Sequence, residues 1–257
     1  MTLYKRVDIL GCPFDAISFE ETMALIRDTV TSGQRRQFVP GSIDFVMKAR
    51  RDPVFAEELW KADIVFADGM PIVWAASLLG TPIRGRVPGT DVVWECARVS
   101  QQTGCGIAMI GGDFSLTKGA AEKMREAFPK AALHPLPTPF PLGEKENEEL
   151  VRQIRALQPG IVLVALGAPR QERWVKRNLE ACGANVGIGI GSAFDIISGS
   201  KPRAPRWMQD NGLEWFHRMM LEPRRLGKRY LIDDSPFLFY LTLEIVRRTF
   251  HRNGRKP

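Results

Sequence analysis

Apolar segments that end in glycine turns and lead into helices recur along the chain. The segment Ile64 to Ala67 ends at an aspartate and a glycine, and a helix is expected from Pro71 to Leu79. Ile107 to Ile110 and Ile161 to Leu166 end in similar turns before predicted helices. Strands that alternate with helices, without hairpin signals, form mostly parallel sheets with helices on both faces. We therefore expect an α/β fold with a Rossmann-like, mostly parallel sheet.

The remaining elements follow from local signals. Ser18 and Glu21 form a capping box that opens a helix to about Thr31. Thr90 or Asp91 is expected to cap the helix that follows the basic loop. Further strands are predicted at Lys5–Leu10, Gln37–Val39 and Val186–Ile190. Further helices are predicted to begin near Asp44, at Pro53 and after Gly167, to run from the turn at Asp113 to about Phe128, and to cover Glu144–Leu157. The segment Pro135–Gly143 is expected to be irregular.

Several classes of protein are disfavoured by what the sequence lacks. The four cysteines, which show no Cys-x-x-Cys spacing, are expected to be reduced core thiols. Residues 1–11 lack the charged region and apolar run of a signal peptide, so none is expected there, and no apolar run reaches the roughly 18 residues of a spanning helix. The three histidines lie far apart, so no metal and no other cofactor is expected. The Gly-x-Ser-x-Gly motif of serine hydrolases is also missing. We expect a cytoplasmic protein.

Asp68 is the strongest candidate for a catalytic group. Ligands of open α/β sheets bind at the carboxyl ends of strands, and Asp68 follows such a strand beside Gly69. A carboxylate there is well placed to act as a general base. The alternative is that Asp68 only caps the next helix.

The glycine turns suit a phosphorylated ligand, because a turn into a helix N-terminus presents free N–H groups. None matches a dinucleotide or P-loop fingerprint, and each alone is equally explained as a tight turn without a ligand. Arg86 has the geometry to bind phosphate, Gln171 to contact a sugar or base, and Asp195 to bind a ribose hydroxyl or cap a helix. The residues assigned to substrate binding from these turns are Gly69, Gly111, Gly112, Asp113, Gly167 and Pro169.

The excess of positive charge lies at the C-terminus. Residues from Lys201 onward hold 13 Lys and Arg against 6 Asp and Glu, whereas residues 1–200 hold 23 of each, which leaves the whole net charge of +7 in this tail. Apolar and basic segments in alternation suit an anionic membrane. A solvated tail packed on its own domain, or an apolar subunit interface in a homo-oligomer, are the alternatives. Nucleic acid is not expected, because no recognition motif accompanies the charge.

We therefore divide the chain into an α/β catalytic domain, residues 1–205, and a basic, amphipathic, α-helical appendage, residues 206–257, that associates with the membrane. The residues assigned to the membrane or to a lipid diphosphate are Arg218, Arg224, Arg225, Lys228 and Arg229.

Motifs spread over most of the chain, from about Val7 to Tyr230, resemble the WecG/TagA/CpsF family of bacterial glycosyltransferases. The matching segments are Ala62–Gly69, Arg86–Asp91, Ile110–Gly112, Ala165–Glu172, Gly189–Asp195, Ser198–Gly199, Arg203–Pro205 and Gly212–Arg218.

The resemblance implies a metal-independent inverting transferase. Such enzymes move a sugar from a UDP donor to a monosaccharide on a polyprenyl diphosphate at the inner membrane face, in cell-surface or exopolysaccharide biosynthesis. The family's proposed base corresponds to Asp68, and its substrate-binding arginine and glutamine to Arg86 and Gln171. Phe194 and Arg203 stand in matching motifs and are assigned to substrate binding with them. The basic appendage is thought to dock on the membrane and help complete the active site.

One departure from the family pattern concerns the donor. Members usually carry Thr-x-Asn-x-(Glu/Asp) after the second strand, where this chain has Pro40 and Ser42 in place of the threonine and asparagine. These positions lie near the transferred sugar in the family, and Ser42 is therefore assigned to substrate binding. N-acetylmannosamine, glucose and a uronic acid are therefore all open as the donor sugar.

Two other functions compete with this interpretation. An NAD-dependent UDP-sugar epimerase or dehydrogenase would need the dinucleotide fingerprint, which is absent. A non-catalytic, membrane-associated nucleotide-binding module would share the fold and the tail but would release no UDP.

Overall fold

The computed structural model describes residues 4–253, except the side chains of Arg225 and of residues 251–253. Its main sheet has six strands in the order β4-β3-β8-β7-β5-β6, and each pair of neighbours is parallel. The expected Rossmann-like α/β fold is confirmed. The strands are β3 (Arg36–Gly41), β4 (Ile64–Ala67), β5 (Gly106–Gly111), β6 (Ala132–Pro135), β7 (Pro159–Ala165) and β8 (Val186–Gly189).

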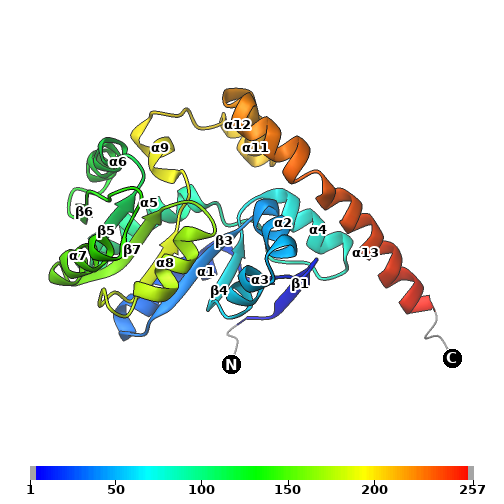
Figure 1. Cartoon of the computed structure of the whole chain (residues 1–257), viewed down its shortest axis with the longest axis horizontal. Coiled ribbons are helices and arrows are strands. Elements are labelled where there is room, and N and C mark those ends of the chain that lie inside the picture. Colours follow the sequence, from blue (N-terminus) through cyan, green and yellow to red (C-terminus); the bar gives the residue numbers. More distant parts are fainter. Residues whose placement is uncertain (1–3, 254–257) are drawn as a thin grey trace.

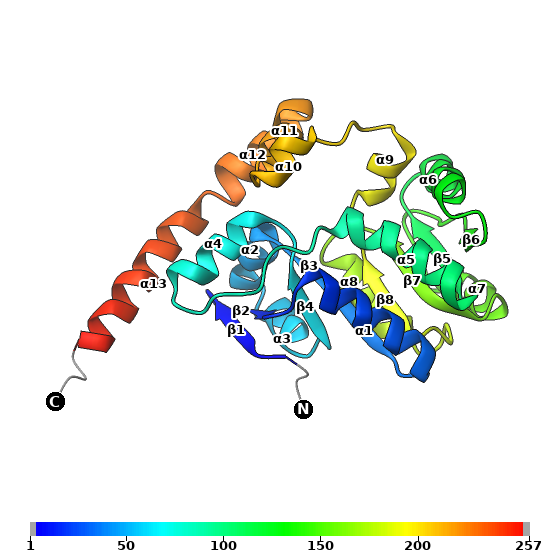
Figure 2. The ribbon, with the colours of Figure 1, turned by 180° about the vertical axis from the view of Figure 1, so that it is seen from behind.

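Helices cover both faces of this sheet. Helices α7 and α8 lie on the face seen in Figure 1, whereas α1 and α5 lie on the face seen from behind in Figure 2. The helices up to residue 198 are α1 (Phe19–Ser32), α2 (Ile43–Arg51), α3 (Pro53–Trp60), α4 (Met70–Leu78), α5 (Gly89–Thr103), α6 (Phe114–Ala127), α7 (Glu144–Ala156), α8 (Arg170–Asn178) and α9 (Ala193–Ser198).

Alternate residues of each strand enter opposite cores, as the period of a strand requires. Phe38, Ile64 and Phe66 pack into one buried cluster, and Val39 and Val65 pack into the other. Because both faces are covered, the strands are mostly apolar, and Gln37 within β3 is buried and donates to the Glu172 carbonyl at 2.9 Å. The sheet therefore offers its polar groups to a ligand only at its strand ends.

The chain contains a hairpin that no signal in the sequence indicated. Strands β1 (Arg6–Ile9) and β2 (Cys12–Asp15) form an antiparallel pair. Their turn places Leu10 at φ 56° and Gly11 at φ 90°, and the first is a conformation that bulky residues rarely adopt. The turn uses Leu-Gly in place of the Asn-Gly or Asp-Gly pair that usually indicates a hairpin in a sequence.

Two local boundaries also differ from expectation. Helix α5 begins at Gly89 after Pro88, so neither Thr90 nor Asp91 caps it. The region expected to be irregular from Pro135 onward is preceded by strand β6, which pairs with β5. The Ser18 capping box is confirmed, with the Glu21 N–H donating to the Ser18 hydroxyl at 3.2 Å.

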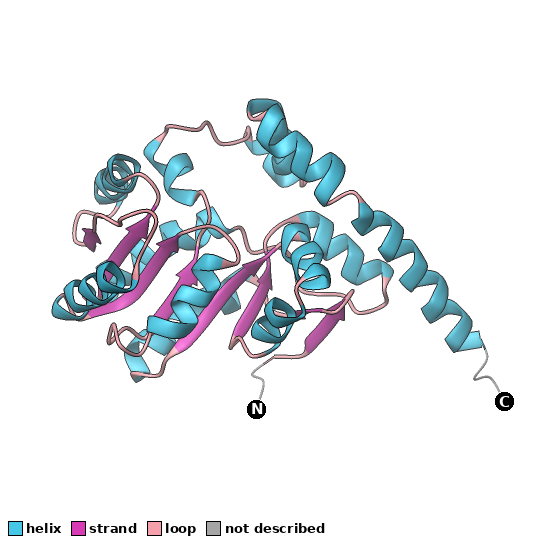
Figure 3. Ribbon diagram, in the orientation of Figure 1, coloured by secondary structure: helices cyan, strands magenta, loops and turns pink. Residues whose placement is uncertain are grey.

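The C-terminal appendage consists of helices joined by short turns. Its first part, residues 206–228, lies above the carboxyl ends of the strands, towards which the arrows in Figure 3 point, and its last helix extends beside the body. The appendage comprises α10 (Arg206–Asp210), α11 (Glu214–Leu221), α12 (Pro223–Lys228), the π-helix η1 (Arg229–Asp233) and α13 (Pro236–Asn253). A boundary at residue 205 stays a prediction.

Helix α13 packs along the α/β body by one side. Phe237 and Leu241 are buried in the same core cluster as β4. The Arg50 guanidinium lies 3.8 Å from the ring centroid of Tyr240, and Arg248 donates to the Leu79 carbonyl at 3.0 Å. None of the helices within residues 4–253 is long and apolar enough to span a membrane.

Candidate active site

Asp68 lies at the carboxyl end of β4 and is half-buried. Its N–H donates to the Gly41 carbonyl at 2.8 Å, which continues the pairing of β4 with β3. The Gly89 N–H donates to Asp68 Oδ1 at 3.3 Å. The carboxylate is therefore held between the end of the sheet and the start of α5.

Two glycines make this position possible. Gly69 adopts φ 122°, in the region that favours glycine, and α4 starts immediately after it. A Cβ atom on Gly89 would lie 3.3 Å from Asp68 Oδ2. A larger residue at either position would strain the turn or displace the carboxylate.

The surroundings of Asp68 raise its pKa from 3.8 to about 6. Burial is the largest cause, because it disfavours the charged form. The positive charges of Arg218 and Arg86 and the Gly89 hydrogen bond lower the pKa, whereas the negative charge of Glu214 raises it. A carboxylate with this pKa is largely ionised at neutral pH and still accepts a proton readily, as a general base must.

The appendage contributes charged groups to this site. Glu214, at the start of α11, accepts a hydrogen bond from Arg86 Nη1 at 3.3 Å and lies 3.9 Å from Arg203 Nε. Arg203 also pairs with Asp91 at 2.6 Å. Arg218, on the same helix as Glu214, contacts the Ser192 hydroxyl after β8. Arg86 and Arg203 thus meet at Glu214, and the charges of Arg86, Arg218 and Glu214 act on Asp68. The sequence singled out Asp68 and the three arginines but assigned no role to Glu214.

Gln171 is almost fully buried, with 2% of its surface exposed. Its Oε1 atom accepts from the N–H groups of Gly167 and Gly191, each at 3.1 Å, and its Nε2 atom donates to Glu172 Oε1 at 2.7 Å. The side chain therefore joins the turns after β7 and β8. This geometry supports a positioning role, and direct contact with a substrate stays a prediction.

The other glycine turns are also partly used by the fold itself. The Gly111 N–H donates to the Thr138 hydroxyl at 2.9 Å, and a Cβ atom there would lie 2.6 Å from the backbone of Ala165. Asp113 accepts from the Ser115 N–H at 2.8 Å and caps α6. Gly112, by contrast, is exposed, so this turn is where a phosphate would find open backbone.

The remaining predicted substrate residues are spread around the strand ends. Phe194, on α9, is buried in the core. Asp195 pairs with Lys201 at 2.7 Å. Ser42 is half-buried immediately before α2, and Pro169 is half-buried before α8.

The predicted basic residues of the appendage divide into two groups. Arg218 and Arg229 face the body, and Arg229 lies 3.6 Å from Asp44. Arg224 and Lys228 are exposed. Arg225 lies in α12, but its side chain is outside the described part of the chain. Within residues 4–253, no group of three or more His, Cys, Asp or Glu could hold a metal ion.

Residues 7–251 match the model of the glycosyl transferase WecG/TagA/CpsF family. The chain belongs to this family. The resemblance seen in the motifs is thereby confirmed over nearly the whole sequence, including the appendage that brings Glu214 and Arg218 to the strand ends.

Curated relatives of similar length carry a specific name. The chain is 24% identical, over 95% of its length and 94% of the relative's, to the N-acetylglucosaminyldiphosphoundecaprenol N-acetyl-beta-D-mannosaminyltransferase of Staphylococcus aureus strain NCTC 8325 / PS 47. The protein of the same name from strain MRSA252 matches with the same identity and coverage.

Proposed function

We propose that the protein is a metal-independent, inverting glycosyltransferase that moves a sugar from a UDP-sugar to a monosaccharide on a polyprenyl diphosphate. The product would serve cell-surface or exopolysaccharide biosynthesis. Membership of the family and the names of the relatives support the class of reaction and the lipid-linked acceptor. The observation that carries the proposal is the half-buried Asp68, with a raised pKa, beside arginines from both the body and the appendage.

In the proposed reaction, Asp68 accepts the proton of the acceptor hydroxyl. The hydroxyl oxygen then bonds to the anomeric carbon of the donor sugar, and the bond from that carbon to the UDP oxygen breaks. Attack opposite the leaving group inverts the anomeric configuration. General base catalysis of this kind contributes on the order of 10²–10⁴-fold.

Arginines would balance the charge that appears on the departing UDP. Arg86 and Arg203 lie 3.3 and 3.9 Å from the Glu214 carboxylate, and Arg218 contacts the Ser192 hydroxyl. Guanidinium groups neutralise phosphate charge and hold it by paired hydrogen bonds. This arrangement supports a mechanism in which arginines take the part that a metal ion plays in other transferases.

The identity of the donor sugar depends on the residues after β3. Pro40 is tolerated there because β8 pairs with β3 only over Arg36 to Phe38, so the proline lies beyond that ladder. The relatives named above transfer N-acetylmannosamine, and Pro40 and Ser42 depart from the family pattern. N-acetylmannosamine, glucose and uronic acid donors are therefore all candidates.

The appendage is proposed to bind the cytoplasmic face of an anionic membrane. Phe239, Leu243, Val246 and Phe250 are 62%, 51%, 46% and 72% exposed and recur at helical spacing on the side of α13 away from the body. The exposed apolar side chains on α11 and η1 are Trp215, Phe216, Met220, Leu221, Leu231 and Ile232. Nearby cations complement anionic lipid headgroups.

The test measures UDP release from UDP-N-acetylmannosamine, UDP-glucose and UDP-glucuronic acid, with N-acetylglucosaminyl diphosphate on a short prenyl chain as acceptor. We expect release with one donor only and only in the presence of acceptor. Asp68→Asn should abolish it while donor binding persists, whereas Asp28→Asn, an exposed aspartate on α1, should not change it. Release by no donor, together with UDP binding, would favour the non-catalytic module, and a spectroscopic response to NAD would favour the epimerase or dehydrogenase.

A further inference from the structure

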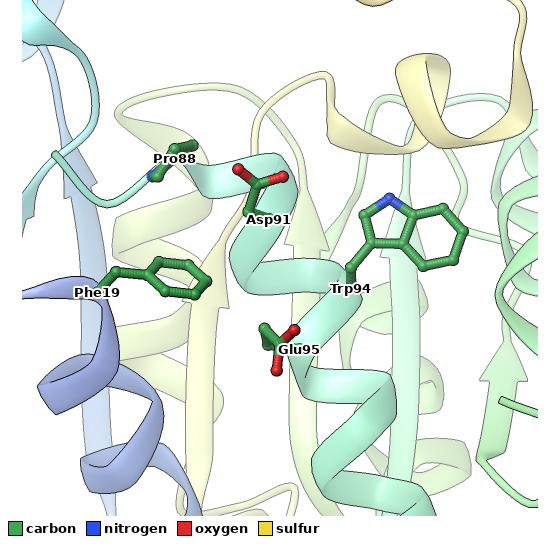
Figure 4. Close-up of a pocket in the computed structure, with 5 residues that line it drawn as sticks. All are labelled: Phe19, Pro88, Asp91, Trp94 and Glu95. Carbon is green, nitrogen blue, oxygen red and sulfur yellow. The ribbon is translucent and has the colours of Figure 1, made fainter. Parts of the chain in front are cut away.

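A cavity of about 330 Å³ opens between the start of α1 and the first turns of α5. Its lining residues are Phe19, Pro88, Asp91, Trp94 and Glu95, shown in Figure 4. The volume is within the range of small-molecule sites, which are usually apolar with a few polar groups. No residue of this cavity except Asp91 takes part in the site described above.

The lining combines two aromatic rings with two carboxylates. The face of an aromatic ring carries partial negative charge and attracts weakly positive hydrogens, such as those on the C–H face of a pyranose ring. Carboxylates accept hydrogen bonds and donate none, so Asp91 and Glu95 suit the hydroxyl groups of a sugar and disfavour phosphate. Glu95 is held by Arg98 at 3.2 Å. The chemistry of this cavity is therefore that of a saccharide site.

The cavity adjoins the proposed catalytic groups. Pro88 precedes Gly89, whose N–H donates to Asp68. Asp91, on the rim, pairs with Arg203, which in turn lies 3.9 Å from Glu214 of α11. Beyond these groups, the same helix exposes apolar side chains. A path from the cavity thus passes the arginines and reaches the apolar surface of the appendage.

We propose that this cavity binds the sugar of the lipid-linked acceptor. The acceptor consists of a sugar, a diphosphate and an apolar chain, and the protein presents an aromatic and acidic cavity, arginines and an exposed apolar surface in the same order. A UDP-sugar has no apolar chain. The open Gly112 turn follows β5, four strand spacings from β4 and thus roughly 19 Å away, which leaves separate room for the nucleotide. This inference rests on the proposed function.

Trp94→Ala tests the assignment. With the short-chain acceptor, the KM for acceptor should rise on the order of tenfold, the effect of losing one well-packed aromatic contact. The KM for the donor should stay unchanged. Trp94→Phe keeps an aromatic wall and should restore most of the affinity for acceptor. Trp60→Ala removes an exposed tryptophan from α3 and serves as the matched control, with thermal melting as the check on folding.

A binding measurement separates this inference from the proposed function. Saturation-transfer NMR with methyl N-acetylglucosaminide reports contact with a sugar whether or not transfer occurs. Signal in the wild type that is lost in Trp94→Ala and in Glu95→Gln supports the cavity even where no UDP is released. An increase in the donor KM instead of the acceptor KM would assign the cavity to the donor sugar. Unchanged acceptor KM and unchanged signal in both variants would overturn the inference.

Discussion

Replacement of Asp68 by asparagine should remove activity and at the same time stabilise the fold. Burial holds the pKa of Asp68 at about 6 in the folded protein, against 3.8 as its ordinary value. The folded state therefore binds the proton more tightly than the unfolded chain does. Stability contributed by the protonated form is present at low pH and is lost as the pH rises from about 4 through about 6.

The size of the effect follows from the shift in pKa. A change from 3.8 to about 6 corresponds to about 3 kcal/mol of unfavourable free energy for the ionised form at pH 7 and above. The side chain is half-buried, and solvent screening makes this an upper value. Asp68→Asn carries no charge, so it should unfold at higher urea concentration than the wild type at pH 8 and at nearly equal concentration at pH 4.

The same pKa sets the pH dependence of catalysis. Activity that needs ionised Asp68 should be half-maximal near pH 6 and fall about tenfold for each further unit of acid. Initial rates of UDP release from pH 4.5 to 8.5 measure this limb, and urea titrations of both proteins measure stability. A limb near pH 4, or an asparagine variant that is less stable than the wild type at pH 8, would refute the reasoning.

Three further predictions concern groups around this site. Glu214→Gln removes the negative charge that raises the pKa of Asp68, so the acid limb of the pH profile should move to lower pH, and a shift to higher pH would contradict this. Gln171→Ala leaves two backbone N–H groups without their buried acceptor and should lower the free energy of unfolding by about 2–3 kcal/mol in urea titrations; a loss below 1 kcal/mol would exclude the positioning role. Leu243→Asp places a charge on the outward face of α13 and should reduce binding to phosphatidylglycerol vesicles in sedimentation assays without changing the melting temperature. Val54→Asp, at an exposed position of α3, should leave binding intact. Equal binding by the wild type and both variants would make the appendage a purely structural element.

The position of Asp68 could be predicted because its signals are local. An apolar segment, an acid, a glycine and a proline at the second helical position define the end of β4 and the start of α4 within a few residues. The same local logic identified the other strands of the sheet that precede glycine turns. It failed at Leu10, where a leucine occupies a conformation for which its side chain gives no signal.

The partners of Asp68 could not be predicted in this way. Glu214 and Arg86 are separated by 128 positions in the sequence and meet only because the appendage returns over the strand ends. The orientation of Gln171 depends equally on tertiary packing. A Cβ atom on Gly189 would lie 2.6 Å from the Gln171 amide nitrogen, so the glycine on β8 makes room for that side chain. The pattern of residues showed which groups carry chemistry, and the packing showed which of them already bind one another.

The two-sided packing of α13 has a consequence for how such an enzyme would meet its substrate. Because the inner side of this helix is fixed to the body by Phe237 and Leu241, lipid contact on the outer side would fix the tilt of the whole molecule on the bilayer. An acceptor anchored in the same leaflet would then arrive by lateral diffusion in two dimensions. Its saturation would be set by the number of acceptor lipids per unit area of membrane, and dilution of the surrounding buffer would leave the rate unchanged for protein already adsorbed.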